Sequence, residues 1–137
     1  MKKFILILLF LPLFSNAQYI DALSFQNSIR SYYNLNPYII DINLNNQAQA
    51  WANQIALTDE FNFSPDTLGE TLYYFKKTTG VSRPNNVFLD AAVSWAIDAD
   101  EASFNQTICS NCSSVGYGIS ENIEYIYIVA KYDKLWQ

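Results

Sequence analysis

The sequence predicts an α+β protein folded as a three-layer α-β-α sandwich. Segments with apolar residues at helical spacings of three and four dominate the earlier part of the chain, and strand-like segments dominate its end. The final segment, 123–132, is apolar on both of its alternating faces, as is typical of a central strand covered on each side. Such a strand requires helices on both faces of its sheet, and the sandwich follows from that requirement.

Two helices are expected in the first half of the chain. The first covers 19–33 and ends before Pro37, which cannot continue a helix and biases Asn36 towards extended geometry. Its turn-spaced stripe is predicted to comprise Ile20, Leu23, Asn27 and Arg30. The second helix follows a cap at Asp41 or Asn43 and carries a stripe of apolar and small residues: Leu44, Ala48, Trp51, Ala52 and Ile55.

The second half is expected to supply a third helix and the strands. Segment 61–70 contains Asn, Ser, Pro, Asp and Gly and is predicted to be a loop, and a short strand follows at 71–75. Asn86 predicts the cap of a helix over 87–101 with a buried stripe of Phe88, Ala91, Ala92, Trp95 and Ala99. Segment 115–119 and the final segment predict a hairpin.

The beginning of the chain has the character of a signal peptide. Two lysines precede an apolar run at 4–14, and small residues follow it up to Ala17. We expect cleavage after Ala17, so that 1–17 is a signal peptide and 18–137 is the single domain of a secreted, extracellular protein. The alternative is an N-terminal membrane anchor, but this run is short for a span of about 20 residues, and no stable membrane span is expected.

The charge of the chain excludes some classes of partner. Its formal net charge is −5, and loss of the two signal-peptide lysines leaves six Lys and Arg against thirteen Asp and Glu, a net charge of −7. Lys76-Lys77 is the single basic cluster of the expected mature sequence. An acidic protein repels phosphate backbones and anionic lipid headgroups, so neither nucleic acid nor an anionic membrane surface is an expected partner.

An oxidising compartment predicts two kinds of covalent modification. Cys109 and Cys112 favour a small local disulfide that fixes a turn. The alternatives are free thiols or a redox pair, but redox pairs begin a helix after a strand, whereas this pair leads into a strand. Asparagine sequons make Asn62 and Asn105 possible N-glycosylation sites of a glycoprotein, and Asn111 is a weaker site because a bonded Cys112 would stiffen it.

A series of short motifs occurs in a characteristic order. They are Gln26-Asn27-x-x-Arg30, Ala48-Gln49-Ala50-Trp51-Ala52, Gly69-Glu70-Thr71-Leu72, Trp95-Ala96-Ile97-Asp98, Phe104-Asn105-Gln106 and Val115-Gly116-Tyr117-Gly118. In order and spacing the chain resembles the CAP superfamily, whose domain is also called the SCP domain, over about 25–132. Members include cysteine-rich secretory proteins, wasp venom antigen 5 and plant pathogenesis-related proteins. The resemblance implies the CAP/SCP type of α-β-α sandwich.

The resemblance also implies a central cleft in which two histidines and two acidic residues can bind a divalent metal such as zinc. Position by position, the acids match Glu70 and Asp98, and the histidine positions match Phe63 and Ser103. The chain contains no histidine. Two carboxylates and a hydroxyl make a poor zinc site, although they could hold calcium or magnesium weakly with waters. We therefore expect neither the family's metal site nor a cofactor.

Binding, rather than catalysis, is the expected function. The commonest proton-transfer group is missing, and the resemblance implies a partner that is an extracellular protein or a small lipid such as a sterol or fatty acid. The alternative is a hydrolase or a weak divalent-metal protein that uses Glu70 and Asp98 as a carboxylate pair. We favour the interpretation that both accept hydrogen bonds from backbone groups or tyrosine hydroxyls. Gln26 and Tyr33, at positions where the family often has histidine, are likewise expected to pack and to form hydrogen bonds rather than to take part in chemistry.

Overall fold

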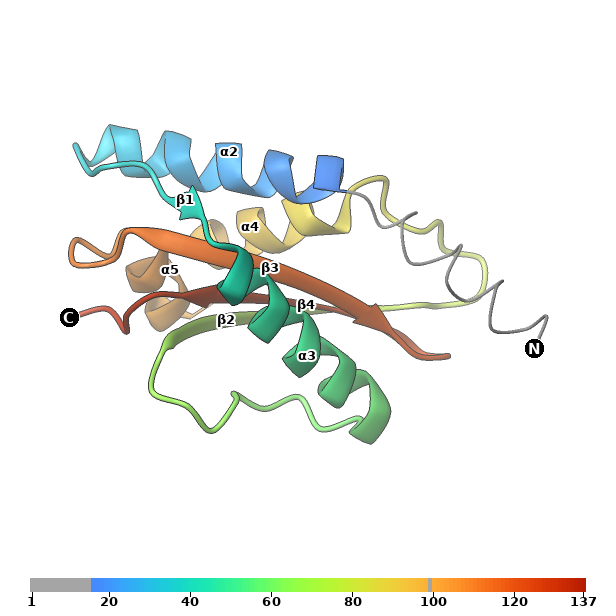
Figure 1. Cartoon of the computed structure of the whole chain (residues 1–137). Helices are drawn as coiled ribbons and strands as arrows, with labels where there is room; N and C mark the ends of the chain where they lie inside the picture. Colours follow the sequence, from blue (N-terminus) through green and yellow to red (C-terminus); the bar gives the residue numbers. More distant parts are fainter. Residues whose placement is uncertain (1–15, 99) are drawn as a thin grey trace.

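The computed structural model describes residues 16–137 with the exception of Ala99, and it confirms the α+β class and the sandwich (Figure 1). The predicted signal peptide lies outside the described residues up to position 15. The described elements are α2 (Asn16–Tyr32), β1 (Ile39–Ile40), α3 (Ile42–Thr58), β2 (Gly69–Lys76), α4 (Val87–Ile97), α5 (Glu101–Thr107), β3 (Ser114–Glu121) and β4 (Tyr125–Tyr132).

The strands form one sheet in the order β1-β3-β4-β2. β4 is central and pairs antiparallel with both β2 and β3, so that Ile128 lies opposite Tyr73 on one side and Ile119 on the other. β1 adds two residues in parallel to the outer edge of β3. The prediction of a central last strand is therefore confirmed.

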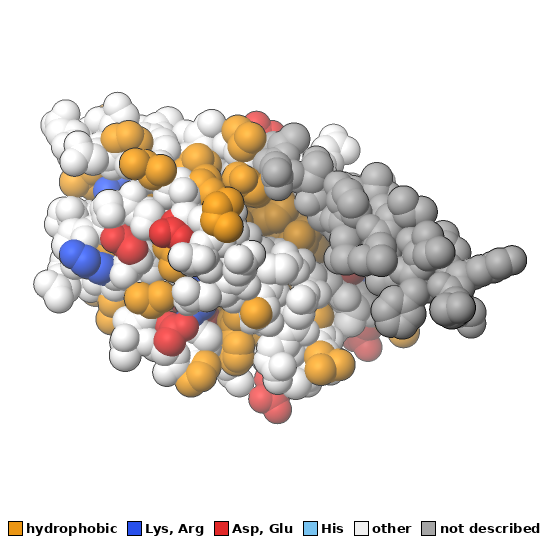
Figure 2. Space-filling view, viewed as in Figure 1, with side chains coloured by type: hydrophobic (Ala, Val, Ile, Leu, Met, Phe, Trp, Pro, Cys, Tyr) orange, Lys and Arg blue, Asp and Glu red, His pale blue; other side chains and the backbone are white. Residues whose placement is uncertain are grey.

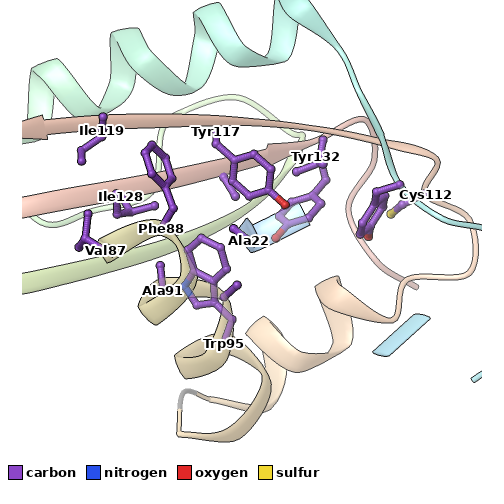
Figure 3. Packing of buried hydrophobic residues seen from close by; sticks show 14 of the residues in the cluster. Ala22, Val87, Phe88, Ala91, Trp95, Cys112, Tyr117, Ile119, Ile128 and Tyr132 are labelled. Carbon is purple, nitrogen blue, oxygen red and sulfur yellow. The ribbon is translucent and has the colours of Figure 1, made fainter. Parts of the chain in front are cut away.

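Helices cover both faces of this sheet (Figure 1). On one face, α2 and α4 pack over Ile126, Ile128 and Ala130 of β4, and on the other face α3 packs over Tyr127 and Val129. Figure 3 shows Phe88 and Trp95 of α4 directed towards the strands within the larger core. The Trp95 indole N–H donates to the Leu72 carbonyl of β2 at 2.9 Å, which satisfies its one polar group in the core.

Two glycines of β3 let α3 approach the sheet closely. A Cβ at Gly116 would lie 2.1 Å from the Asn45 backbone nitrogen, and one at Gly118 would lie 2.4 Å from that of Gln49. The Gln49 side chain uses this proximity, because its Oε1 accepts from the Ile119 N–H at 3.0 Å and its Nε2 donates to the Ile119 carbonyl at 2.5 Å. The motifs around Gln49 and Gly118 are thus the two sides of one contact.

The structure corrects the prediction for the third helix. The predicted helix over 87–101 ends at Ile97, with Asp98 as its C-cap, and α5 begins a new helix at Glu101. The cause is Asp100, whose carboxylate accepts from the Ser103 N–H at 2.8 Å and caps α5. Ala99, assigned to the buried stripe, lies outside the described residues.

The buried stripe of α2 also differs from the predicted one. Ala22, Gln26 and Arg30 are buried at spacings of four, whereas Ile20 is exposed and Leu23 is half-buried. The apolar spacing misplaced this face because two of its three buried side chains are polar. Polar side chains can be buried at such positions only where hydrogen-bonding partners are present inside the core.

Candidate functional site

A cavity of about 290 Å³ lies between the loop that follows α3, the start of β2, helix α5 and the C-terminal tail. We call it the central cavity. Three of the four positions carried over from the family line it, namely Phe63, Glu70 and Ser103. The other residues that line it are Ser64, Asp66, Thr67, Leu68, Ala102, Gln106, Leu135 and Trp136. Asp98, at the end of α4, is exposed and does not line the cavity.

Glu70, in the lining of this cavity, is held by hydrogen bonds and an ion pair. Its carboxylate accepts from the Ser64 backbone N–H at 2.9 Å and from the Ser64 hydroxyl at 2.5 Å. The Nζ of Lys131 lies 3.1 Å from Glu70 Oε1, and only 4% of the Glu70 side chain and 2% of the Lys131 side chain are exposed. The carboxylate is therefore paired and hydrogen-bonded rather than presented to the cavity as a free base.

Lys131 is the residue that the sequence analysis missed. It extends from β4, donates to the Ser64 hydroxyl at 2.7 Å and forms an ion pair with Asp66 as well as with Glu70. Burial alone would raise the pKa of Asp66, but the hydrogen bond from Lys131 brings it below its ordinary value. The signal that could have identified it is that Lys131 is the one charged residue of β4, a strand that is otherwise buried and apolar on both faces.

Neither Phe63 nor Ser103 supplies a metal ligand as strong as the histidine that the family has at the same position. The Phe63 ring is exposed on the loop, and Ser103 is half-buried in the first turn of α5, where its N–H donates to Asp100. In the described part of the chain, no group of three or more His, Cys, Asp or Glu side chains could hold a metal ion. Since Glu70 and Asp66 already share the ammonium of Lys131, the residues present do not fit the family's zinc site.

The C-terminal tail closes one wall of the central cavity through Gln106. The Nε2 of Gln106 donates to the Lys134 carbonyl at 2.9 Å, and the Oε1 of Gln106 accepts from the Trp136 N–H at 3.1 Å. Gly69 permits this contact, because a Cβ there would lie 2.4 Å from the Lys134 carbonyl oxygen. Gly69 makes room for the tail, and Glu70 beside it pairs with Lys131.

The two cysteines form the predicted disulfide, Cys109–Cys112, and both are buried. Arg30 of α2 holds the turn that they close, because its guanidinium donates to the carbonyls of Thr107, Cys109 and Cys112 at 2.8–3.2 Å. The same guanidinium lies 3.9 Å from the centre of the Tyr38 ring, in a cation–π contact. These contacts give Cys109–Cys112 and Arg30 a structural role.

A buried polar network occupies the core beside the disulfide. The Gln26 amide donates to the hydroxyl of Tyr132 at 2.9 Å and accepts a short hydrogen bond from the hydroxyl of Tyr117. Tyr132 also pairs with the Thr71 hydroxyl at 2.9 Å. Burial raises the pKa of Tyr117 well above its ordinary value and that of Tyr132 to about 12, so both remain neutral hydrogen-bonding groups at ordinary pH.

A second hollow of about 350 Å³ lies between α2, the end of α4 and α5. We call it the apolar groove. None of the described residues that line it is charged, and two of them, Tyr32 and Ile97, are largely exposed. The lining residues are Phe25, Ser28, Ile29, Tyr32, Tyr33, Ala96, Ile97 and Phe104.

The possible glycosylation sites differ in accessibility. Asn62 is exposed in the loop after α3, where its carbonyl accepts from the Trp51 indole at 2.8 Å. Asn105 is half-buried within α5. Asn111 is half-buried in the disulfide turn. Asn62 is therefore the sequon best placed for a modifying enzyme.

Comparison with known proteins agrees with this architecture. The model of the Cysteine-rich secretory protein family, CAP, matches residues 23–132. No curated protein sequence matches significantly. Among solved structures, NaASP2 crystallised with Zn²⁺ is similar with a TM-score of 0.71 and 15% identity, over 86% of this chain and 80% of that one.

Two further structures show the same likeness. BmVAL-1 has a TM-score of 0.69 and 19% identity over 88% of this chain and 78% of its own. Venom allergen-like protein 4 of Schistosoma mansoni has a TM-score of 0.62 and 12% identity over 90% of this chain and 95% of its own. Identities this low show a shared fold alone. Because the family model spans most of the sequence, the chain belongs to the Cysteine-rich secretory protein (CAP) family.

Proposed function

We propose that this protein is a secreted, non-enzymatic binding protein whose ligand is a neutral lipid of the sterol class, held in the apolar groove. The observation that carries the proposal is the groove itself, which has a volume of about 350 Å³ and is lined by described residues none of which is charged. Its aromatic and aliphatic lining includes three exposed side chains, Tyr32, Tyr33 and Ile97. Small-molecule sites are typically concave, mostly apolar and of at least about 300 Å³. Burying these side chains against a lipid would remove their apolar surface from water.

The charges around the groove favour a sterol over a fatty acid. A fatty-acid carboxylate needs a cation, yet Asp98 directly follows the lining residue Ile97, and Glu101 begins the helix that carries Phe104. The nearby Arg30 is buried and donates to backbone carbonyls. A sterol hydroxyl needs only one hydrogen-bonding partner. The Ser28 hydroxyl in the lining donates its own proton to the Phe25 carbonyl at 2.7 Å and can accept the proton of the sterol hydroxyl.

The geometry gives no support to the hydrolase alternative. Glu70 is paired with Lys131 inside the central cavity, and Asp98 does not line that cavity. A glycosidase-like mechanism needs two carboxyl groups that face one another across a substrate.

Among the described residues, no helix is both long and apolar enough to cross a membrane. Two points support secretion: the predicted signal peptide at 1–17, and the membership of the chain in a family whose proteins are typically secreted.

Titration of the 18–137 protein with a fluorescent sterol tests the lipid proposal. We expect saturable binding that an Ile97→Glu substitution weakens at least about tenfold, because it puts a charge into the groove. Ile97 is 70% exposed, so its replacement leaves the core intact. The matched control is Ile123→Glu, at a residue that is 93% exposed and outside the groove.

The outcomes separate the candidate partners. Absence of saturable sterol binding by the folded protein would contradict the lipid proposal and favour an extracellular protein partner. Tighter binding of palmitate than of sterol would contradict the argument from charge. A calorimetric zinc titration tests the central cavity, and tight zinc binding would overturn the conclusion that its residues do not fit a metal.

A further inference from the structure

We propose that a pocket at the end of α3 binds the methylated ammonium group of a small organic cation, such as choline. The pocket has a volume of about 150 Å³ and is lined by Asp59, Phe61, Tyr74, Tyr125 and Tyr127. We call it the aromatic pocket. It shares no lining residue with the central cavity or the apolar groove, so it is a site additional to the proposed sterol function.

Four aromatic rings form the walls of this pocket. Phe61 and Tyr125 both stack on Tyr127, with ring centres 6.0 and 5.6 Å apart. Tyr74 stands nearly at right angles to Phe61 and to Tyr125, at 84° and 82°, with ring centres 5.1 and 5.6 Å away. The four ring centres therefore form a closed circuit, three rings nearly parallel and the fourth perpendicular.

The strands fix most of these rings, because Tyr74 of β2 lies directly opposite Tyr127 of β4 in the register. Tyr127 is buried and belongs to the smaller core, but 39% of Phe61 and 51% of Tyr74 remain exposed. Core packing accounts for Tyr127 and leaves much of the surface of Phe61 and Tyr74 in water. An apolar or cationic occupant of the pocket would remove part of this exposed ring surface from water, which is favourable.

The carboxylate of Asp59 is also among the groups that line the aromatic pocket. Asp59 ends α3 in the left-handed conformation, φ 58° and ψ 21°, which turns the chain towards Phe61. Its Oδ1 accepts from the Asn122 amide at 2.5 Å and from the Tyr127 hydroxyl at 3.3 Å. Asn122 is itself fixed, because its Nδ2 donates to the Ala56 carbonyl and its Oδ1 accepts from the Tyr125 N–H. The negative charge is thus held in place before any ligand arrives.

Aromatic faces and a carboxylate together select a cation. Ring faces carry negative electrostatic potential and attract quaternary ammonium groups, and the carboxylate adds attraction that a neutral ligand would not feel. Walls at right angles suit a compact, nearly spherical head, whereas a sugar ring stacks flat on a single face. The carboxylate disfavours anions, so choline is a better ligand than phosphocholine.

One basic residue opposes this attraction. Lys76 lies opposite Tyr125 in the register, on the same face of β2 as Tyr74. Its ammonium adds positive potential to the same side of the sheet. A Lys76→Gln substitution is therefore expected to tighten choline binding about twofold.

The decisive comparison sets choline against its neutral carbon isostere, 3,3-dimethylbutan-1-ol (dimethylbutanol below). Each is titrated into the 18–137 protein, and binding is followed by calorimetry or NMR. Choline should bind saturably with a dissociation constant of about 1 mM or tighter, and the isostere about tenfold more weakly. Sedimentation with phosphatidylcholine vesicles, with phosphatidylglycerol vesicles as the control, distinguishes a lipid headgroup from a free small molecule as the source. Retention by phosphatidylcholine vesicles alone identifies the headgroup.

Matched substitutions assign the binding to the aromatic pocket. Asp59→Asn keeps the shape and an oxygen for the Asn122 amide, and Asn tolerates the left-handed conformation, so the fold is retained while choline binds about fivefold more weakly. Glu60→Gln removes a neighbouring charge outside the lining, so it controls for long-range electrostatics and should weaken choline binding by no more than about twofold. Tyr74→Leu should weaken binding about fivefold, and Tyr74→Phe, which keeps the ring face, should restore it.

Three results would overturn the proposal. The first is no choline binding at about 10 mM, well above the expected dissociation constant. The second is equal binding of choline and dimethylbutanol, which would remove the role of charge. The third is an equal effect of Asp59→Asn and Glu60→Gln, which would place the attraction elsewhere on the acidic surface.

Discussion

At the scale of single residues, Lys131 and Glu70 place opposite charges in the interior, where each depends on the other. Transfer of a charge out of water costs several kcal/mol, and the ion pair with hydrogen bonds offsets this cost. Ser64 completes the arrangement by donating both its N–H and its hydroxyl to Glu70. Removing one partner should therefore cost more than removing both.

Lys131→Met tests this dependence. We expect the free energy of unfolding, measured with urea, to fall by about 3 kcal/mol because Glu70 loses its ion-pair partner. The double substitution Lys131→Met with Glu70→Gln should recover part of that loss. The control is Lys134→Met, an exposed lysine whose replacement should change stability by less than about 0.5 kcal/mol. Equal losses for the single and the double variant would contradict the interpretation.

Buried tyrosines link stability to alkaline pH. Burial raises the pKa of Tyr38 and Tyr117, and that of Tyr132 to about 12, whereas tyrosine in an unfolded chain ionises near pH 10. The unfolded state therefore releases these protons first. The stability contributed by the neutral hydroxyls is complete below about pH 10 and is lost as the pH rises towards about 12.

Urea unfolding at pH values from about 8 to 12 measures this loss. Tyr132→Phe should have lower stability at neutral pH, since it loses the bonds to Gln26 and Thr71, but a shallower decline above about pH 10. An unfolding free energy that stays constant up to pH 12 would contradict the assignment.

At the scale of elements, the sequence predicted what depends on local patterning. β4 was recognisable because apolar residues fill both of its faces, and α3 because its stripe has helical spacing. β1 was missed, since two residues are too short for a pattern. The break between α4 and α5 was missed because a helical stripe continues across it, while the Asp100 cap is a single side-chain contact.

The central cavity was predictable only in part, for a related reason. The positions Phe63, Glu70 and Ser103 could be located by motif, and the structure brings them together. The ion pair of Glu70 with Lys131 joins residues far apart in the sequence. Pairing of this kind follows from the β2–β4 register, which no local pattern specifies.

Contact between α3 and β3 makes a sharp prediction for Gly118. Gly118→Ala places a Cβ 2.4 Å from the backbone of α3, so the helix must move outward, and we expect a loss of about 3 kcal/mol in unfolding free energy. Ser120→Ala, two residues further along the same face of β3, should change stability by less than about 0.5 kcal/mol. Thermal melting of both variants gives the answer, and equal melting temperatures would contradict the close contact.

The disulfide turn between α5 and β3 offers a second test. Replacement of Cys109 and Cys112 by alanine should lower the unfolding free energy by about 2 kcal/mol, the low value expected for so short a loop. Alkylation before reduction, followed by mass measurement, should label no thiol in the mature protein. Labelling of two thiols would contradict the disulfide.

At the scale of the whole molecule, the hollows are distributed over both faces of the sheet. The apolar groove belongs to the α2 and α4 layer, and the aromatic pocket lies at the end of α3 on the other side. Because the two sites lie on opposite sides of the sheet, the two proposed ligands can bind at the same time without competing for contacts. On the face drawn in Figure 2, the coloured basic side chains lie apart from one another rather than in a patch.

Secretion is tested on the chain that includes residues 1–17. We expect cells with a secretory pathway to release a protein whose mass and terminal sequence correspond to a start at Gln18, because the residues before it have the pattern of a cleavable signal. Replacing the apolar run 4–14 with polar residues should retain the protein in the cell. Release of an uncleaved chain would contradict the assigned cleavage site.

The ammonium of Lys131 has one property that a metal ion lacks: it is covalently attached to the domain whose carboxylate it neutralises. A metal is shared with every competing ligand in the surroundings and is lost on dilution or chelation. The ammonium of Lys131 is part of the chain, so its effective concentration beside Glu70 does not depend on the composition of the solution. The cavity around Glu70 should therefore keep its shape in the presence of EDTA, in low-calcium media and after long dilution, so that the domain is indifferent to the ion supply of its environment.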